Sequence, residues 1–498
     1  MSRSLYARLA RRFGDERARR DRREFLKSAA LTAAGLAIGS ALPSCRSAPR
    51  TDDEKEAGRG RRVVVIGAGL AGLACAERLA AQKFSVAVLE ARSRIGGRVL
   101  TMRDFPEGRT RVVEAGGEFI GSNHPNWLRL AQRFGIPLRE IEGDDDPRIM
   151  LGGRVLPDSE ARSLYLEMKK HFAALNEQAR KIDPRAPWEA ADATALDGWP
   201  TDQWIRRLDA SDLCKRAIAA QFTTDNGVLP RDQSFLANLA MIAGGGFEDF
   251  WEHSEDFRGS GGNDRLAEKL AAALPQGSLR LNMPVGRLIV HDDNIEVRGS
   301  RGGRLTGDHV VLAVPPSVWR SIEFDPPMPE SLSPQMGRSV KGLFQLSRRM
   351  WPSADTMTDG EIGMTWEATE GQVGDENPVL TAFTSGPMTD AIRMRPGPRR
   401  SRAYHQSMEE LFRGFTRELI ADRFIDWPSD EWTRAGYSFP APGEVTSLGP
   451  VLRRGIAPAG GASARLHFAG EHCCPAFVGY MEGALTSGIE AAERVAAT

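Results

Sequence analysis

The sequence has few cysteines and no excess of charge of either sign. Its 498 residues include five cysteines, which have neither the paired spacing of metal ligands nor the density of a disulfide-stabilised scaffold. Lysine and arginine together number 66, as do aspartate and glutamate. A balanced composition of this kind is not typical of proteins that bind polyanions. We therefore expect no metal site and no nucleic-acid partner.

The sequence also lacks a long apolar run near its N-terminus. The apolar segment there, residues 28–42, is shorter than the roughly 20 residues that a membrane-spanning helix needs. It follows Arg22 and Arg23 in the stretch "DRREFLKS", and this order resembles a twin-arginine signal peptide, which directs the export of folded proteins. We expect residues 1–45 to form this signal and the protein to be periplasmic or otherwise extracytoplasmic.

The end of this leader leaves membrane attachment open. The stretch "LPSC", residues 42–45, is similar to a lipobox, in which Cys45 would carry a lipid anchor, but Pro43 is not favoured in such a motif. The alternative is an ordinary cleaved signal in which Cys45 has no role. Residues 46–60 are charged and contain proline and glycine, which predicts a disordered tether. We therefore expect the fold to begin at residue 61.

The stretch "VVVIGAGLAGLACAERL", which starts at Val63, has the pattern of a phosphate-binding turn. A short β-branched run leads into three spaced glycines and then into helical spacing over residues 70–81. Glycines there allow a tight bend, close approach of a pyrophosphate and packing of helix on strand, while the helix N-terminus favours negative charge. A second strand ends about 20 residues later in a glutamate that can bind ribose hydroxyls. The pattern predicts a Rossmann-type site for FAD or NAD at Gly67, Gly69, Gly72 and Glu90.

The following segments distinguish between these cofactors. "EARSRIGGRV", residues 90–99, and "VVEAGGEFIG", residues 112–121, resemble the flavin amine oxidase family, which includes monoamine oxidases, polyamine oxidases and L-amino acid oxidases. The resemblance implies FAD, with Arg98 against its pyrophosphate and with Gly116 and Gly117 close to the flavin. This is reasonable because a guanidinium group matches phosphate oxygens and glycine lets backbone approach a flat ring.

The resemblance covers most of the chain after residue 61. "LRLNMPVGRLIV" is similar to the family segment whose valine, here Val285, meets the adenine through its backbone. Residues 466–496, "LHFAGEHCCPAFVGYMEGALTSGIEAAERVA", are similar to the C-terminal flavin motif, in which a helix N-terminus faces the flavin and Glu471 would contact the ribityl chain. The same resemblance implies further cofactor-binding residues: Arg92, Gly97, Gly470 and Met481.

Because these segments lie far apart in the sequence, the FAD domain must be discontinuous. We predict an α/β fold of the amine oxidase kind, in which a Rossmann-type FAD-binding domain is joined to a mixed α+β substrate domain. The FAD domain is expected to comprise residues 61–139, 259–329 and 429–498. The substrate domain is expected to comprise residues 140–258 and 330–428.

Lys341 is a first catalytic candidate. It lies in "MGRSVKGLFQLSRRMW" and matches the lysine that, in the family, hydrogen-bonds a water molecule beside flavin N5. A buried ammonium there would supply positive charge as oxygen is reduced, at a place where a low dielectric strengthens its effect. The alternative is a half-buried lysine whose ammonium extends to solvent.

Tyr437 and Tyr480 are the other catalytic candidates. They match the two aromatic positions that face each other in front of the flavin in monoamine oxidases, where the rings form a slot that aligns the amine and excludes water. Either tyrosine could instead be a core residue. Gly436 precedes Tyr437 at the place where monoamine oxidases have the cysteine that binds their flavin covalently. We therefore expect FAD to be held non-covalently.

The resemblance predicts an oxidase that converts a primary amine, O2 and water into an aldehyde, ammonia and hydrogen peroxide. An alternative substrate is an L-amino acid, handled by an oxidase or a 2-monooxygenase. Many L-amino acid oxidases have a carboxylate-binding arginine where this chain has Glu118 and Phe119, although Arg258 could replace it. A third alternative, a non-catalytic flavin-binding lipoprotein, is disfavoured by Lys341 and the tyrosines. The sequence does not predict an oligomeric state.

Overall fold

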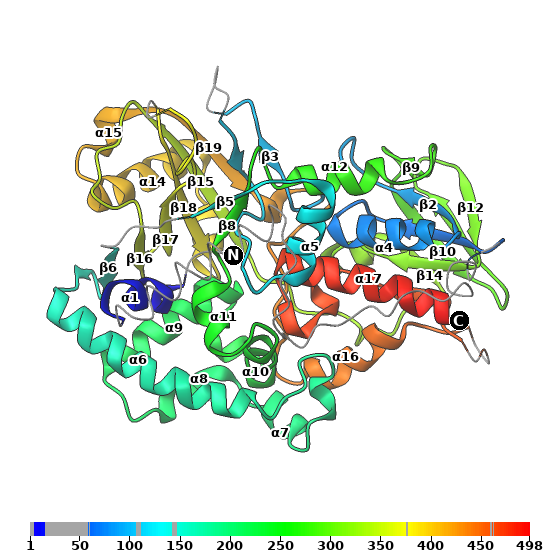
Figure 1. The fold of residues 1–498 in the computed structure, drawn as a ribbon, viewed down its shortest axis with the longest axis horizontal. Helices are drawn as coiled ribbons and strands as arrows, with labels where there is room; N and C mark the ends of the chain where they lie inside the picture. The colour runs from blue at the N-terminus through cyan, green and yellow to red at the C-terminus, as the bar shows by residue number, and fades with distance from the viewer. Residues whose placement is uncertain are drawn as a thin grey trace.

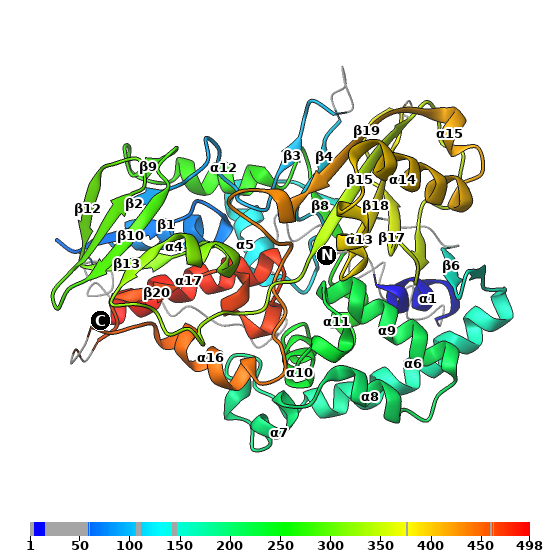
Figure 2. The same ribbon diagram turned by 180° about the vertical axis from the view of Figure 1, so that it is seen from behind.

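The computed structural model describes residues 4–14, 58, 60–105, 111–141, 147–374, 377–458, 461 and 463–498. The arginine pair, the apolar segment after it and Cys45 lie outside these residues. Two parts of the chain lie side by side, one around a parallel sheet and one around a larger mixed sheet covered by helices (Figures 1 and 2). Within the described residues, no helix has the length and apolar character needed to cross a membrane.

The first part is built on a five-stranded parallel sheet. Its strands come from three separate stretches of the sequence, which confirms the predicted discontinuous α/β fold. In spatial order they are β20 (Leu466–Phe468), β13 (His309–Leu312), β1 (Arg62–Ile66), β2 (Ser85–Leu89) and β9 (Leu279–Arg280).

Both faces of this parallel sheet are covered, as expected for strands that are hydrophobic throughout. Val63 and Val65 of β1 pack with a layer of helices, and the alternate residues Val64 and Ile66 pack with a second, four-stranded sheet. The helices are α4 (Leu70–Ala81), α5 (Pro125–Phe134), α12 (Asp264–Ala272) and α17 (Met481–Ala497). The second sheet contains β10 (Val285–Val290), β11 (Ile295–Gly299), β12 (Arg304–Gly307) and β14 (Glu323–Asp325).

The second part is built on a seven-stranded mixed sheet, in agreement with the expected α+β substrate domain. In spatial order its strands are β19 (Leu419–Asp426), β15 (Ser339–Leu346), β18 (Val379–Ser385), β17 (Met364–Glu367), β16 (Thr356–Thr358), β6 (Arg148–Leu151) and β7 (Arg154–Val155). The helices below this sheet in Figure 1 are α6 (Asp158–Ala179), α8 (Thr201–Arg207), α9 (Asp212–Asn226), α10 (Phe235–Gly244) and α11 (Glu248–His253).

Shorter elements complete both parts. Beside the seven-stranded sheet lie α13 (Met388–Arg393), α14 (Gly397–Leu411) and α15 (Phe415–Glu418) (Figure 2). The others are α7 (Ala193–Asp197), α16 (Glu444–Arg454), β3 (Thr101–Met102), β4 (Val113–Glu114), β5 (Leu138–Glu140) and β8 (Phe257–Gly259).

An N-terminal helix, α1 (Leu5–Phe13), packs into the second part of the molecule (Figure 1). Leu5 and Leu9 are fully buried among residues of the substrate domain. The Arg8 side chain is also fully buried and donates hydrogen bonds to the carbonyl oxygens of Thr356, at 2.8 Å, and Thr365, at 3.3 Å. Residues 4–14, which the sequence assigned to a signal peptide, are thus an ordered element of the substrate domain.

Candidate functional site

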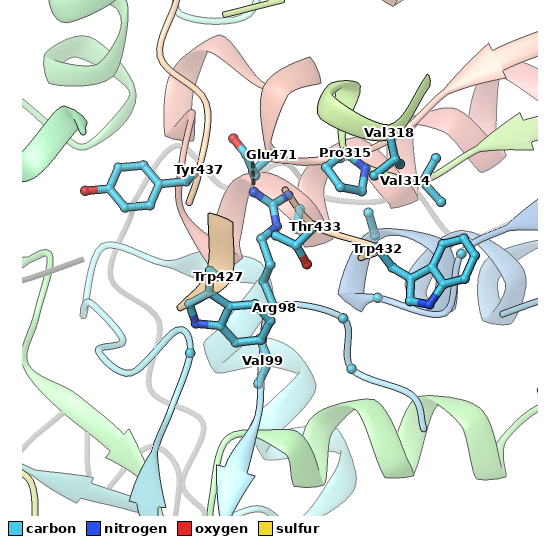
Figure 3. Close-up of a pocket in the computed structure, with 18 of the residues that line it drawn as sticks. Arg98, Val99, Val314, Pro315, Val318, Trp427, Trp432, Thr433, Tyr437 and Glu471 are labelled. Carbon is cyan, nitrogen blue, oxygen red and sulfur yellow. Dashed lines mark hydrogen bonds and ion pairs between the residues drawn. The ribbon is translucent and has the colours of Figure 1, made fainter. Parts of the chain in front are cut away.

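A cavity of about 380 Å³ runs from the turn between β1 and α4 to the first residues of α17 and the edge of the seven-stranded sheet. Figure 3 shows part of its lining, with Arg98 between Trp427 and Glu471. The structure brings all but one of the predicted site residues to this cavity. They are Gly67, Gly69, Glu90, Arg92, Gly97, Arg98, Gly116, Gly117, Val285, Lys341, Tyr437, Gly470, Glu471, Tyr480 and Met481.

The remaining predicted residue, Gly72, does not line the cavity but lies where α4 packs against the glycine turn. A Cβ atom at Gly72 would lie 2.0 Å from the carbonyl oxygen of Gly67, so only glycine lets α4 pack this closely on β1. Gly67 itself has a φ of +103°, which favours glycine. Gly69 precedes the first turn of α4, and a Cβ there would meet no described atom within 4 Å. The turn therefore offers open space at a helix N-terminus, which suits the pyrophosphate of FAD.

Glu90, at which we expect a ribose of the cofactor, lines the cavity. Its carboxylate is 4% exposed and accepts hydrogen bonds from the backbone N–H groups of Ala68, at 2.8 Å, and Arg92, at 2.9 Å. Because a carboxylate oxygen can accept a second hydrogen bond, Glu90 keeps capacity for ribose hydroxyls. The Arg92 guanidinium is bound to the side chains of Asp430 and Thr433, so its orientation is also fixed.

Arg98 and Glu471 join distant segments in the middle of the cavity. Nη1 of Arg98 donates to Oε1 of Glu471 at 2.7 Å and to the carbonyl oxygen of Gly436 at 3.0 Å. Glu471 also accepts from the N–H groups of Ser438 and Gly479. Burial alone would raise the pKa of Glu471, but the Arg98 charge contributes to a net lowering. The ionised carboxylate thus positions Arg98, whose other N–H groups remain able to bind phosphate.

The double-glycine loop can approach the cavity only because it lacks side chains. A Cβ atom at Gly116 would lie 1.9 Å from the carbonyl oxygen of Arg98, and one at Gly117 would lie 3.0 Å from Sδ of Met481. Met481 begins α17, whose N-terminus lines the cavity, as the resemblance implied. Any larger residue at position 116 would push the loop out of place.

Two residues that the sequence analysis missed hold this loop. The side-chain amide of Asn263 donates to the carbonyl oxygens of Gly117, at 3.1 Å, and Glu118, at 2.7 Å. Nε1 of Trp427 donates to the carbonyl oxygen of Ala115 at 2.9 Å. No local pattern marks either residue, because each acts on a loop far away in the sequence.

Lys341 lies on β15, every residue of which is buried. The alternative of an ammonium that extends to solvent is wrong, because Lys341 is 6% exposed. Its Nζ atom donates to the carbonyl oxygens of Glu114, at 3.0 Å, and Gly116, at 2.8 Å, and to Oε2 of Glu118 at 2.8 Å. An ammonium has three N–H groups, and all three therefore have acceptors in the protein.

Glu118 lies between two cations. In addition to Lys341, its carboxylate accepts from Nε of Arg258 at 3.0 Å and from Nε1 of Trp366 at 2.9 Å. Burial alone would raise the pKa of Glu118, but the charges of Lys341 and Arg258 outweigh it and lower the pKa. Arg258 also contacts a carboxylate oxygen of Glu370 at 3.5 Å. The guanidinium considered for a substrate carboxylate is thus bound to acidic residues of the protein.

Both predicted tyrosines reach the far end of the cavity. The Tyr437 hydroxyl donates to the carbonyl oxygen of Thr224 at 3.0 Å, and the ring lies against Gly479, the residue before Tyr480. The Tyr480 ring packs edge-on against His124, with ring centroids 5.3 Å apart. Burial raises the pKa of both phenols, so they stay neutral. The facing arrangement of the two rings stays a prediction.

Comparison with known proteins agrees with the resemblance found in the sequence. A family model described as flavin containing amine oxidoreductase matches residues 70–496. The chain is 30% identical over 466 residues to the protein named "Putative flavin-containing monoamine oxidase AofH" from Mycobacterium tuberculosis, covering 87% of this chain and 96% of that protein. It is 25% identical over 458 residues to an L-amino acid dehydrogenase from Synechocystis, covering 87% and 94% of the two chains.

Solved structures show the same fold at lower identity. Cyclohexylamine oxidase from Brevibacterium oxydans has a TM-score of 0.78 and 24% identity, with 88% of this chain and 99% of that chain covered. Putrescine oxidase bound to putrescine has a TM-score of 0.77 and 23% identity, with the same coverage. The arrangement of the two parts is therefore shared with these enzymes.

Proposed function

Because the chain belongs to the family of flavin-containing amine oxidoreductases, we propose that it oxidises a primary amine with O2 and water to an aldehyde, ammonia and hydrogen peroxide. The chain is an FAD-dependent oxidoreductase, so the alternative of a non-catalytic lipoprotein is not retained. FAD is bound non-covalently, and Gly436, beside Tyr437, offers no thiol for attachment. When bound, FAD accepts the two electrons of the amine and transfers them to the acceptor.

The pairing of Arg258 with Glu118 is the observation that carries the choice of an amine over an amino acid. A substrate carboxylate needs a cation in a buried site, because an unpaired buried charge costs several kcal/mol. Arg258 and Lys341 are both bound to Glu118, and the negative charge of Glu118 would oppose a second carboxylate. The relative named L-amino acid dehydrogenase supports the alternative substrate, but this charge arrangement disfavours it.

The protein's own side chains then position the amine. Tyr480, which is buried, and Tyr437, which is partly buried, present neutral rings to the cavity, and these rings can align a neutral amine and exclude water. Lys341 holds the loop that contains Gly116 and Gly117 through a carbonyl contact at 2.8 Å. These contacts fix the loop that the resemblance places beside the flavin.

The test of this proposal is the stoichiometry of turnover by the FAD-loaded protein. We expect one ammonia and one hydrogen peroxide for each primary amine consumed in air. Product formation with an added dye as acceptor but without peroxide would contradict the use of O2. An amide product from an amino acid would instead support the 2-monooxygenase alternative.

We also propose that Arg22 and Arg23 direct export by the twin-arginine route, with lipid attachment at Cys45 left open. The "DRREFLKS" stretch supports this proposal. Changing both arginines to lysine should leave FAD-loaded protein in the cytoplasm, and unchanged fractionation would contradict the proposal. Sequencing the N-terminus of the exported protein would show whether the chain is cut before Cys45, which would separate α1 from the remainder of the chain.

A further inference from the structure

Four buried or half-buried charges beside the double-glycine loop form one network. Glu118 is 2% exposed and contacts both Lys341 and Arg258, and Arg258 also contacts Glu370. The residues come from four separate segments, and Glu118 and Lys341 are 223 positions apart in the sequence. Because Glu118 and Lys341 both line the cavity, the network lies at the wall on which the resemblance places the flavin.

The hydrogen bonds of this network fix the direction of the Lys341 ammonium. Two of its three N–H groups donate to backbone carbonyl oxygens, and the third donates to Oε2 of Glu118. The bond to Glu118 joins two ionised groups and is therefore the strongest of the three. To bind a water molecule or ligand in the cavity, Lys341 would have to release one of these protein contacts.

The charges of the network also offset one another. Arg139 is a further cation that interacts with Arg258, Glu118 and Glu370, and the negative charge that directly contacts Lys341 is that of Glu118. Lys341 therefore does not present an isolated positive charge to the cavity, contrary to the expectation from sequence. Because the two charges are separated by only about 3 Å, the carboxylate reduces the electrostatic potential that the ammonium produces in the cavity.

We propose that Glu118 is a positioning residue that holds the Lys341 ammonium in place and offsets its charge at the flavin side of the cavity. The inference rests on the FAD site of the proposed function but not on the identity of the amine. It predicts that Glu118 lowers the reduction potential of bound FAD, since the reduced cofactor is more negative than the oxidised one.

Glu118→Gln is the informative variant because it retains the size of the side chain. In the wild-type protein, both carboxylate oxygens accept hydrogen bonds, from Lys341 on one side and from Arg258 and Trp366 on the other. A glutamine has one accepting oxygen and one donating NH2 group, so in either orientation it places a donor against a donor. The substitution therefore removes the negative charge of residue 118 and also its hydrogen bonds either to Lys341 or to Arg258 and Trp366.

The experiment measures the reduction potential of FAD in the purified holoenzyme, without any amine. Glu118→Gln should raise the potential, with at least a tenfold change in the equilibrium constant for two-electron reduction, which corresponds to about 30 mV. Lys341→Met should lower it by a similar amount. The double variant should return close to the wild-type value, because it removes one charge of each sign.

A control separates charge from general destabilisation. Asp197 is a fully buried carboxylate whose partners, among them Ser234 and Thr446, lie outside the cavity lining. Asp197→Asn should lower the melting temperature but leave the potential unchanged. For the network, the double variant should melt above either single variant, because removing one partner of a buried pair is worse than removing both.

Two results would overturn the inference: a wild-type potential in Glu118→Gln, or a double variant with the same potential as Lys341→Met. If Glu118→Gln alone does not fold, comparing the FAD reduction potentials of the double variant and of Lys341→Met still tests the inference. The measurement needs no substrate, so an error in the proposed amine substrate would leave its result unaffected. Conversely, amine turnover with unchanged potentials would contradict only the role of Glu118.

Discussion

The cavity has two walls that differ in composition, and we call them the cofactor wall and the substrate wall. The cofactor wall consists largely of glycines and backbone, and its shape depends on the absence of side chains at Gly67, Gly116 and Gly117. The substrate wall consists of buried charged and aromatic side chains whose partners come from distant segments, and Glu118 and Lys341 lie where it meets the glycine loop of the cofactor wall. We therefore expect substitutions that add a side chain to disrupt the cofactor wall. Substitutions that remove a hydrogen-bond or ion-pair partner should disrupt the substrate wall.

The largest expected effect is on the cofactor wall. Gly116→Ala places a Cβ atom 1.9 Å from the carbonyl oxygen of Arg98, and neither backbone can move away without distorting the loop. Overpacking of this kind costs about 3 kcal/mol, which is roughly a hundredfold in the dissociation constant of FAD. Fluorescence titration of the FAD-free protein would measure this change.

Two other glycines provide controls for this prediction. Gly69→Ala meets no described atom within 4 Å, so the FAD-free protein should melt as the wild type does while FAD binds more weakly. Gly397→Ala, which also has open space but lies on α14 outside the cavity lining, should change neither property. Wild-type affinity in Gly116→Ala would show that the cofactor wall does not depend on close backbone approach.

The next effect concerns α1, on the substrate side. Arg8→Ala removes a fully buried guanidinium and its bonds to the carbonyl oxygens of Thr356 and Thr365. Breaking a buried charge network costs about 3 kcal/mol in the free energy of unfolding. Arg12→Ala is the matched control, because Arg12 pairs with the exposed Asp158 and such surface pairs contribute less than about 1 kcal/mol. Equal destabilisation in urea unfolding would mean that α1 is not held as described.

A third prediction uses pH to test the support of the glycine loop. Burial raises the pKa of Glu114 to about 7, above its ordinary value of 4.5. The folded state therefore binds this proton more tightly than the unfolded state, so the stabilisation is complete below pH 4.5 and is lost as the pH rises through 7. The change is at most about 3 kcal/mol. Melting temperatures between pH 5 and 8 should fall less in Glu114→Gln than in the wild type, and parallel curves would contradict the assignment.

The smallest expected effect is that of a single hydroxyl. Tyr437→Phe retains the ring but removes the bond to the carbonyl oxygen of Thr224, which contributes about 1 kcal/mol to stability. Since we assign the alignment of the amine to the ring, Tyr437→Phe should keep most of the amine oxidation rate while Tyr437→Ala should lose it. A rate in Tyr437→Phe as low as in Tyr437→Ala would assign the function to the hydroxyl instead.

The cofactor wall could be predicted from sequence because the residues that shape it lie close together in the chain. A strand, a glycine turn and a helix specify one another over about 20 residues, and Gly67 is needed for a φ that other residues rarely adopt. The resemblance then located Arg98 and Glu471, although their direct contact at 2.7 Å was not expected.

The substrate wall could be predicted only in part, because its contacts are not local. The sequence analysis identified Lys341 but considered Glu118 only as a replacement for an arginine, since nothing in either segment indicates the other. The helix α1 was missed for a different reason. The helix has only nine residues, and three of them are arginines. A short arginine-rich segment is also typical of the basic start of a signal peptide, so only the packing of α1 in the fold distinguishes a structural helix from such a segment.

The most direct test of the central claim, that the site takes an amine without a carboxylate, is the rate of flavin reduction under anaerobic conditions. The FAD-loaded wild-type protein would be mixed with phenethylamine and, separately, with phenylalanine, which differ only in the carboxylate. The account predicts faster reduction by phenethylamine. Faster reduction by phenylalanine, especially if Arg258→Ala abolished that preference, would contradict it and identify the chain as an enzyme of L-amino acid oxidation.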